Sequence, residues 1–175
     1  MNLYLIGYRG AGKSVTARFL AERLGWPLIQ CDRLIQEKSG QTVAQIFAEQ
    51  GESKFREYEK QVLFETAKLD RHVIDLGGGA VIDLENRKRM LQSGKCVWLQ
   101  ATAEVLWDRI RNDRSTAESR PNLTQLDGLA EVEQLLAQRQ PIYSECAEFV
   151  IDTDELTPQE VAEKIAKWCL NVDTI

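Results

Sequence analysis

The chain contains a run of residues whose types and spacing suit the binding of a phosphate chain. From Gly7 to Ser14 the sequence is Gly-Tyr-Arg-Gly-Ala-Gly-Lys-Ser, which matches the pattern GxxxxGK[ST] directly behind the apolar run of residues 3–6. Glycines let consecutive backbone N–H groups turn toward phosphates, Lys13 can reach the β and γ oxygens, and the Ser14 hydroxyl can ligate Mg²⁺. The alternative is a glycine-rich turn with a solvated lysine. The pattern favours a site for ATP or GTP, formed by Gly10, Ala11, Gly12, Lys13, Ser14 and Val15.

Polar and glycine residues also follow the next two apolar runs. Asp32 comes after residues 27–30, and Gly77-Gly78-Gly79 follows residues 72–76. Ligands of open parallel sheets bind outside the carboxyl ends of the strands, so these residues are expected near the phosphate loop. Taken alone, the position of Asp32 favours a helix N-cap over a ligand contact. The glycines indicate either a sharp turn or a close approach of a ligand or another backbone.

Two arginines are candidates for binding an anion. Arg139 lies in an apolar helical stripe, in which a guanidinium needs either a carboxylate of the fold or an anionic ligand. Arg56 can pair with Glu52 or Glu59 on an exposed helix face, or clamp a planar carboxylate together with Arg139. The stripe, at intervals of three and four residues, consists of Leu129, Val132, Leu136, Arg139 and Tyr143.

The elements that must position these residues alternate along the chain. Apolar runs predict buried strands at residues 2–6, 27–30, 72–76, 95–99 and 148–151. Helical spacing predicts helices near residues 13–24, 33–38, 42–50, 53–68, 83–92, 103–111, 127–145 and 157–170. This alternation predicts an α/β protein with a parallel sheet covered by helices on both faces, in three α/β/α layers.

Local signals refine these helices. An apolar face is expected on the first helix, formed by Val15, Phe19, Leu20 and Leu24. Gly51 is expected to end one helix before the next begins. The candidate helix caps are Ser53, Thr102 and Thr157.

Length and composition favour one globular domain over residues 1–175, with 43% hydrophobic residues. A net charge of −5 and a pI near 5.1 argue against nucleic-acid binding. No stretch approaches the ~20 apolar residues of a membrane span, and no signal segment precedes the first strand, so a cytoplasmic protein without a membrane partner is expected. The four cysteines are scattered without a CxxC pair, which predicts reduced, mostly buried thiols.

The segment 112–124 breaks the alternation because it is polar and aperiodic. It carries Arg114 and Arg120. Loops of this length in compact domains are often lids or binding loops, although an ordinary solvated loop is the alternative.

Together these residues resemble the shikimate kinase family, in order and spacing, over essentially the whole chain. The motifs that carry the resemblance are Gly7–Ser14, Asp32, Phe55-Arg56, Gly77-Gly78-Gly79, Arg120-Pro121 and Arg139 with Tyr143. The resemblance implies a P-loop NTPase fold with a five-stranded parallel sheet, similar to the nucleoside monophosphate kinases. It also implies transfer of the ATP γ-phosphoryl group to the 3-hydroxyl of shikimate, giving shikimate 3-phosphate and ADP for aromatic amino acid biosynthesis.

The resemblance further implies roles for matching residues on the acceptor side. Arg56 and Arg139 hold the shikimate carboxylate, while Asp32 and the backbone of Gly78 and Gly79 hold ring hydroxyls. Asp32 also orients or deprotonates the attacking hydroxyl.

On the nucleotide side, the resemblance implies that Lys13 and Arg120 neutralise the transferring phosphoryl group. Ser14 binds Mg²⁺, and Arg109 packs against adenine. It implies a shikimate-binding segment at residues 33–60, a lid at residues 112–124, and a monomer whose partners are the small molecules shikimate and ATP.

The sequence departs from the family pattern at two positions. The family usually carries an Asp two residues before the substrate-binding Asp, where it supports the Mg²⁺ shell through water, but here the sequence is Gln30-Cys31-Asp32. Gln brings no negative charge, so Mg²⁺ should be held less firmly. Asp75 stands where the family usually has a small or uncharged residue, and it could partly replace the missing carboxylate. A related kinase for another hydroxylated acid stays open as an alternative. A non-catalytic nucleotide- or shikimate-binding domain is a second alternative, which Gln30 alone supports.

Overall fold

The computed structural model of the chain describes residues 1–113 and 128–172. The residues 114–127 and 173–175 lie outside the described part. Arg114, Arg120 and nearly all of the predicted lid at residues 112–124 therefore stay predictions.

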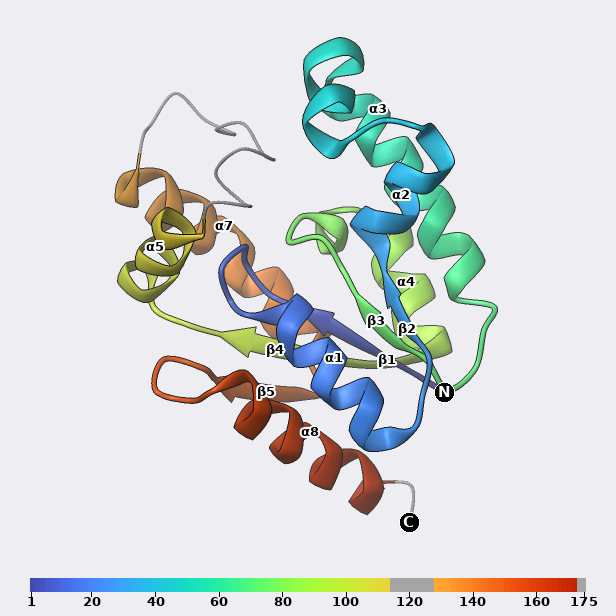
Figure 1. The fold of residues 1–175 in the computed structure, drawn as a ribbon, viewed down its shortest axis with the longest axis vertical. Helices are drawn as coiled ribbons and strands as arrows, with labels where there is room; N and C mark the ends of the chain where they lie inside the picture. Colours follow the sequence, from blue (N-terminus) through green and yellow to red (C-terminus); the bar gives the residue numbers. More distant parts are fainter. Residues whose placement is uncertain (114–127, 173–175) are drawn as a thin grey trace.

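A parallel sheet forms the middle of the molecule (Figure 1). Its five strands are β1 (Asn2–Ile6), β2 (Leu28–Gln30), β3 (Val73–Asp75), β4 (Gly94–Gln100) and β5 (Phe149–Asp152), in the order β2-β3-β1-β4-β5. Every residue of the central strand β1 is buried. The parallel five-stranded sheet predicted from the apolar runs is confirmed, because strands buried on both faces need continuous apolar sequence.

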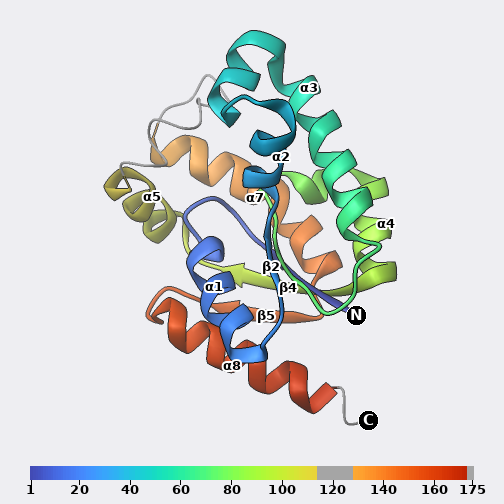
Figure 2. The same ribbon diagram turned by 45° about the vertical axis from the view of Figure 1, so that its right-hand side comes forward.

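Helices cover both faces of this sheet (Figures 1 and 2). They are α1 (Lys13–Leu24), α2 (Cys31–Ser39), α3 (Val43–Thr66), α4 (Leu84–Ser93), α5 (Ala103–Asn112), α7 (Leu129–Cys146) and α8 (Pro158–Val172), with a 3-10 turn, η1 (Ala80–Ile82). Both views show α1 and α8 side by side on one face and α3 and α4 on the other. The three-layer α/β/α arrangement is therefore confirmed.

Two apolar cores lie on the opposite faces of the sheet. Leu3 and Leu5 of β1 pack into the core beneath α1 and α8, whereas Tyr4 and Ile6 pack into the core beneath α3 and α4. This is the alternation of side chains that a strand imposes. The predicted burial of the thiols is confirmed as well, since all four cysteines are buried and none forms a disulfide.

The predicted apolar face of α1 is wrong at two positions. Val15 is 46% exposed and Phe19 is 38% exposed, whereas Ala17 and Ala21 are buried. The helix packs closely on the sheet and on α8, so small residues occupy the contact, and intervals of three and four residues alone cannot distinguish this face from the neighbouring one. Val15 instead borders the cleft beside the phosphate loop.

The helix signals are partly confirmed. The predicted helices 42–50 and 53–68 meet within α3 at Gly51, whose φ of 81° and ψ of 170° are non-helical, so the predicted break between them is confirmed. The capping role of Ser53 stays a prediction. Thr102 precedes α5 as predicted but makes no capping bond through its side chain, whereas the Thr157 hydroxyl accepts from the backbone N–H of Glu160 at 3.3 Å. Among the described residues, no helix has the length and apolar character needed to cross a membrane.

Candidate active site

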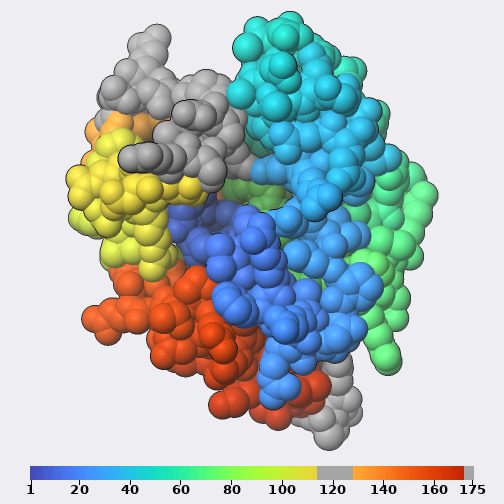
Figure 3. Space-filling model, viewed as in Figure 1, coloured from blue at the N-terminus to red at the C-terminus, as the bar shows by residue number. Residues whose placement is uncertain are grey.

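The carboxyl ends of the strands open into a cleft of about 520 Å³, a size typical of small-molecule sites. Figure 3 shows a hollow between α1 and the lobe formed by α2 and the first turns of α3. The phosphate loop, the end of β2 and the first two glycines of the triplet, Gly77 and Gly78, all border this cleft. The expectation that residues after the strands converge at one edge is met by this arrangement.

Backbone geometry explains the glycines of the phosphate loop. Gly7, Gly10 and Gly12 have φ values of 137°, 82° and 84°, which side-chain-bearing residues rarely adopt. A Cβ on Gly7 would also lie 2.5 Å from the carbonyl oxygen of Leu99. The Lys13 ammonium folds back across the loop and donates to the carbonyl oxygens of Gly7 and Tyr8, each at 2.9 Å. A buried cation thus sits inside a loop shaped for an anion.

Close neighbours explain the triplet Gly77, Gly78 and Gly79. A Cβ on Gly77 would lie 3.0 Å from Oε1 of Glu59, one on Gly78 would lie 3.2 Å from the carbonyl oxygen of Gly7, and one on Gly79 would lie 2.5 Å from Nη2 of Arg56. None of the three has a positive φ. The structure therefore favours close approach over the turn as the reason for glycine, although the backbone does turn into η1 here.

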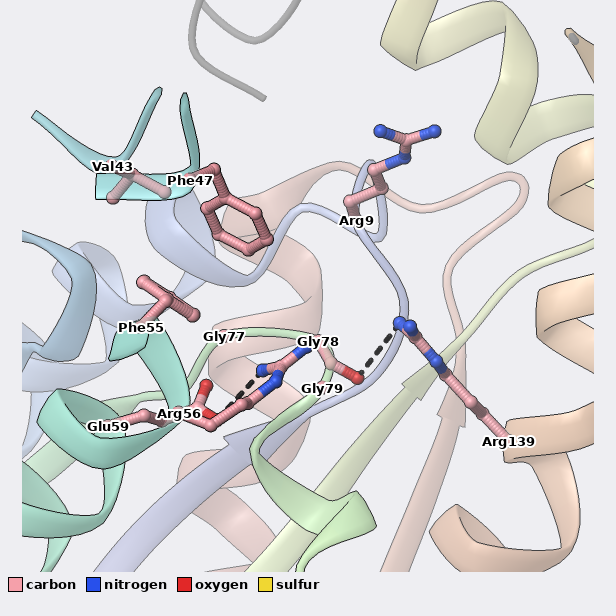
Figure 4. A pocket seen from close by; sticks show the side chains of 10 residues that line it. All are labelled: Arg9, Val43, Phe47, Phe55, Arg56, Glu59, Gly77, Gly78, Gly79 and Arg139. Carbon is pink, nitrogen blue, oxygen red and sulfur yellow. Dashed lines mark hydrogen bonds and ion pairs between the residues drawn. The ribbon is translucent and has the colours of Figure 1, made fainter. Parts of the chain in front are cut away.

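A second, smaller cavity adjoins the cleft and brings the two predicted arginines together (Figure 4). Arg56 comes from α3 and Arg139 from α7, and both guanidinium groups lie beside the glycine triplet. The cavity is lined by Arg9, Val43, Phe47, Phe55, Arg56, Glu59, Gly77, Gly78, Gly79 and Arg139. The guanidinium groups of Arg56 and Arg139, with Arg9 also in the lining and apolar side chains on the wall, suit a small anion that carries a ring.

Arg56 is held in place by carboxylates of its own helix. Its Nη1 donates to Glu59 at 2.8 Å, and its Nη2 donates to Glu52 at 2.9 Å. The expectation of an exposed pair is wrong for Glu59, which is only 3% exposed. Burial raises the pKa of the Glu59 carboxyl, and the nearby charges of Arg56 and Arg139 offset this only in part.

Arg139 is buried, as its place in the apolar stripe predicts, and the fold supplies it with a carbonyl. Its Nη1 lies 3.4 Å from the carbonyl oxygen of Gly78, and its guanidinium lies 5.5 Å from the ring centroid of Tyr8. The Tyr143 hydroxyl donates to the same Gly78 oxygen at 2.6 Å. The guanidinium therefore keeps donors that can bind an anion in the cavity.

Sequence reasoning missed Arg9, which borders both the cleft and the smaller cavity. Its Nη2 donates to Oε1 of Glu131 at 2.5 Å, and Glu131 is buried at the start of α7. Arg9 occupies a variable position of the phosphate-loop pattern, so the pattern gives no signal for it. The pair ties the phosphate loop to α7.

Asp32 lines the cleft, but it is not the N-cap of α2. Gln30 is the N-cap, and Asp32 lies in the first helical turn, so the cap interpretation was wrong. The helix begins earlier than the sequence suggested because β2 passes directly into α2. Lys13, Ser14 and Asp75 border the same cleft, so Asp32 faces the region where the phosphate loop ends.

Arg109 borders the other end of the cleft. Its Nη1 donates to Oγ1 of Thr153 at 3.1 Å, and its Nη2 donates to the carbonyl oxygen of Thr153 at 2.5 Å. The connection after β5 therefore fixes this side chain at the cleft edge. Its packing against adenine stays a prediction.

A parallel sheet with a phosphate loop after its first strand, beside a cavity with two arginines, defines a P-loop kinase of a small anionic acceptor. A family model described as shikimate kinase matches residues 9–170. A shikimate kinase from Symbiobacterium thermophilum is 42% identical over 165 residues, which cover 94% of each chain. The chain belongs to the shikimate kinase family and is an ATP-dependent phosphotransferase.

Solved structures agree with this assignment. A shikimate kinase from Acinetobacter baumannii in complex with shikimate is 34% identical, with a TM-score of 0.90, and the match covers 97% of this chain and 93% of that one. A deoxyadenosine kinase from M. mycoides is 16% identical with a TM-score of 0.63, over 98% of this chain and 100% of that one. The latter similarity concerns the fold alone. The predicted fold class is confirmed.

Proposed function

We propose that the chain transfers the γ-phosphoryl group of ATP to the 3-hydroxyl of shikimate, giving shikimate 3-phosphate and ADP. The observation that carries this proposal is the cavity beside the phosphate loop, into which Arg56 and Arg139 both direct their guanidinium groups. Shikimate is a cyclic acid with one planar carboxylate and three ring hydroxyls. Its carboxylate matches the guanidinium groups of Arg56 and Arg139, and its ring matches the apolar side chains of this cavity.

In this proposal the two arginines share the shikimate carboxylate. Arg56 is braced by Glu59, and Arg139 is oriented beside the Gly78 carbonyl, so neither guanidinium must be ordered when the substrate binds. The backbone of Gly78 and Gly79 and the carboxylate of Asp32 hold the ring hydroxyls. Asp32 lies in the first turn of α2, from which it accepts the hydrogen of the attacking hydroxyl and orients the oxygen.

The nucleotide occupies the cleft lined by the phosphate loop. Residues Gly10–Val15 surround the phosphates, and Arg109 packs against the base. Phosphoryl transfer depends mainly on positioning and on cations that balance the spread negative charge. Lys13 supplies one such cation by exchanging the carbonyl oxygens of Gly7 and Tyr8 for phosphate oxygens.

The donor set beside the phosphate loop fits Mg²⁺. The Ser14 hydroxyl, the Asp75 carboxylate and the Gln30 amide border the cleft, and hard oxygen donors of this kind suit this ion. Among residues 1–113 and 128–172, no cluster of three or more His, Cys, Asp and Glu side chains forms a complete protein cage for a metal. Ser14, together with the ATP phosphates, would hold Mg²⁺, and the ion would supply positive charge to balance the phosphate oxygens.

We also propose that the chain acts as a monomeric, single-domain cytoplasmic enzyme over residues 1–175, with residues 33–60 as the acceptor-binding segment. Support comes from α3, whose residues between Val43 and Glu59 form one wall of the smaller cavity, and from α2, whose Arg33 and Gln36 border the adjoining cleft. Gel filtration with light scattering tests the monomer.

A coupled assay of ADP release, with and without shikimate, tests the activity. We expect turnover only when shikimate and Mg²⁺ are both present, and phosphorus NMR should locate the new ester at the 3-hydroxyl. Shikimate methyl ester is the matched acceptor, because it keeps the hydroxyls and loses the carboxylate charge. Turnover with another hydroxylated acid but not with shikimate would overturn the proposed substrate. Shikimate binding without turnover would indicate a non-catalytic domain.

A further inference from the structure

Gln30 and Asp75 stand side by side at the carboxyl end of the sheet. They are the last residues of the adjacent parallel strands β2 and β3, and they are partners in the strand register. Both border the cleft beside Ser14 of the phosphate loop. Gln30 and Asp75, the two positions that depart from the family pattern, are therefore direct neighbours in the structure.

Asp75 is an unusual carboxylate because it is only 7% exposed and faces a site for phosphates. Burial raises the pKa of Asp75, while the Lys13 charge and hydrogen bonds with the side chains of Ser14 and Gln30 lower it. Lys13 is also the cation that ATP phosphates recruit. Phosphates brought into this cleft would leave Asp75 facing like charge at low dielectric unless a cation lies between them.

We propose that the Asp75 carboxylate supports the Mg²⁺ that accompanies ATP, with Gln30 as its uncharged neighbour that orients it. The supporting negative charge would thus lie on β3 in this chain, one strand away from its usual place on β2. Ser14 connects the two parts, because it belongs to the phosphate loop and borders the same cleft as Asp75. The inference rests on the nucleotide half of the proposed function and is independent of the acceptor.

Binding of Mn²⁺ in the presence of ADP tests this inference without any turnover. Electron paramagnetic resonance of free Mn²⁺ should show that Asp75→Asn raises the Kd for the metal about 10- to 100-fold, the usual effect of losing a supporting carboxylate. In EDTA, the same variant should bind ADP as tightly as the wild type or more tightly, because a repulsive charge is gone. If Asp75 had a purely structural role, Asp75→Asn would weaken ADP binding both in the presence of Mn²⁺ and in EDTA.

The exchanged pair Gln30→Asp/Asp75→Asn provides the second variant. It returns the carboxylate to β2, and it should recover most of the lost Mn²⁺ affinity if the position of the charge is what matters. Asp152→Asn is the matched control, since it removes a carboxylate from the end of the edge strand β5. Wild-type Mn²⁺ affinity in Asp75→Asn, or no recovery in the exchanged pair, would overturn the inference. If these shifts appear while shikimate stimulates no ADP release, the acceptor assignment alone fails.

Discussion

The Tyr143 hydroxyl donates a hydrogen bond to the carbonyl oxygen of Gly78 at 2.6 Å, which joins α7 to the glycine triplet. Tyr143 is fully buried, so this hydroxyl has little access to water. Arg139 lies one helical turn earlier and directs Nη1 toward the same oxygen. The short bond from Tyr143, with the longer contact from Arg139, therefore holds the triplet in place beside the smaller cavity.

Replacing Tyr143 with Phe should damage the acceptor site more than the fold. We expect the free energy of unfolding to fall by about 1 kcal/mol, because a buried carbonyl loses a donor. The KM for shikimate should rise several-fold, with little change in the KM for ATP, because the triplet is no longer anchored. Chemical denaturation and steady-state kinetics measure these effects.

Tyr4→Phe is the matched control for this prediction. The Tyr4 hydroxyl lies 2.6 Å from Oγ of Ser93, at a position outside both cavities. We expect a similar loss of stability and no change in the KM for shikimate. Equal kinetic effects of the two substitutions would contradict an anchoring role for Tyr143.

Gly79→Ala should act through Arg56. A Cβ at residue 79 would lie 2.5 Å from Nη2 and 2.6 Å from Nη1 of that guanidinium, so the side chain must move away from Glu59. We expect a loss of about tenfold or more in kcat/KM for shikimate, from one misplaced charged hydrogen-bond donor. A double-mutant cycle with Arg56→Ala is the measurement, and Gly79→Ala should cost little more once the guanidinium is absent. Additive losses would argue against this mechanism.

The free energy of unfolding should depend on pH through the Glu59 carboxyl, and the burial of this group sets the direction of the dependence. Burial raises the pKa of Glu59 above its usual value of 4.5, so the folded protein takes up this proton at a higher pH than the unfolded chain. The stabilisation from protonation is complete below the unfolded value and is lost as pH rises through the folded value. Wild-type protein should therefore lose unfolding free energy relative to Glu59→Gln as pH rises above the unfolded value and through the raised folded value.

Denaturant unfolding at several pH values tests this difference, because other groups titrate equally in both proteins and cancel. Glu57→Gln removes a carboxylate from the exposed side of the same helix and controls for the change in net charge. A gap between wild type and Glu59→Gln that stays constant with pH would contradict the assignment.

The sequence alone predicted the parts of this molecule that depend on local pattern. The glycines of the phosphate loop, the five apolar strands and the break at Gly51 each follow from backbone conformation or strand burial. The contact partners of individual side chains could not be predicted from these local patterns. The contact between Arg9 and Glu131 joins residues far apart in the sequence, and periodicity gives the face of a helix without its neighbour.

The error at Val15 and Phe19 has the same cause. Both residues fit an apolar stripe on α1, yet α8 and the sheet cover the adjacent face, where alanines permit close packing. A stripe specifies a spacing, and the tertiary contact decides which of two neighbouring stripes is buried. Asp32 was also misassigned, because the first residue of α2 depends on how β2 leaves the sheet.

Substitution of Arg139 should impair use of the acceptor and leave nucleotide binding nearly unchanged. Removing its guanidinium in Arg139→Ala deletes charge-assisted hydrogen bonds to the acceptor, so we expect kcat/KM for shikimate to fall about 10- to 100-fold. Binding of a non-hydrolysable ATP analogue should change little, because Arg139 lines the acceptor cavity and is absent from the lining of the nucleotide cleft. Arg139→Lys keeps the charge without the planar fork and should recover only part of the loss.

Shikimate methyl ester makes this prediction specific to the carboxylate. Wild-type enzyme should use the ester poorly, and Arg139→Ala should lower that residual activity far less than it lowers activity with shikimate, because the lost contact is already missing. Circular dichroism of each variant checks that the fold persists, since Arg139 also packs over the Tyr8 ring. If Arg139→Ala lowered use of the ester and of shikimate equally, the guanidinium would be supporting the cavity wall rather than binding the carboxylate. If Arg139→Ala lowered the affinity for the ATP analogue as much as it lowered the use of shikimate, this would contradict the division of the site into an acceptor cavity and a nucleotide cleft.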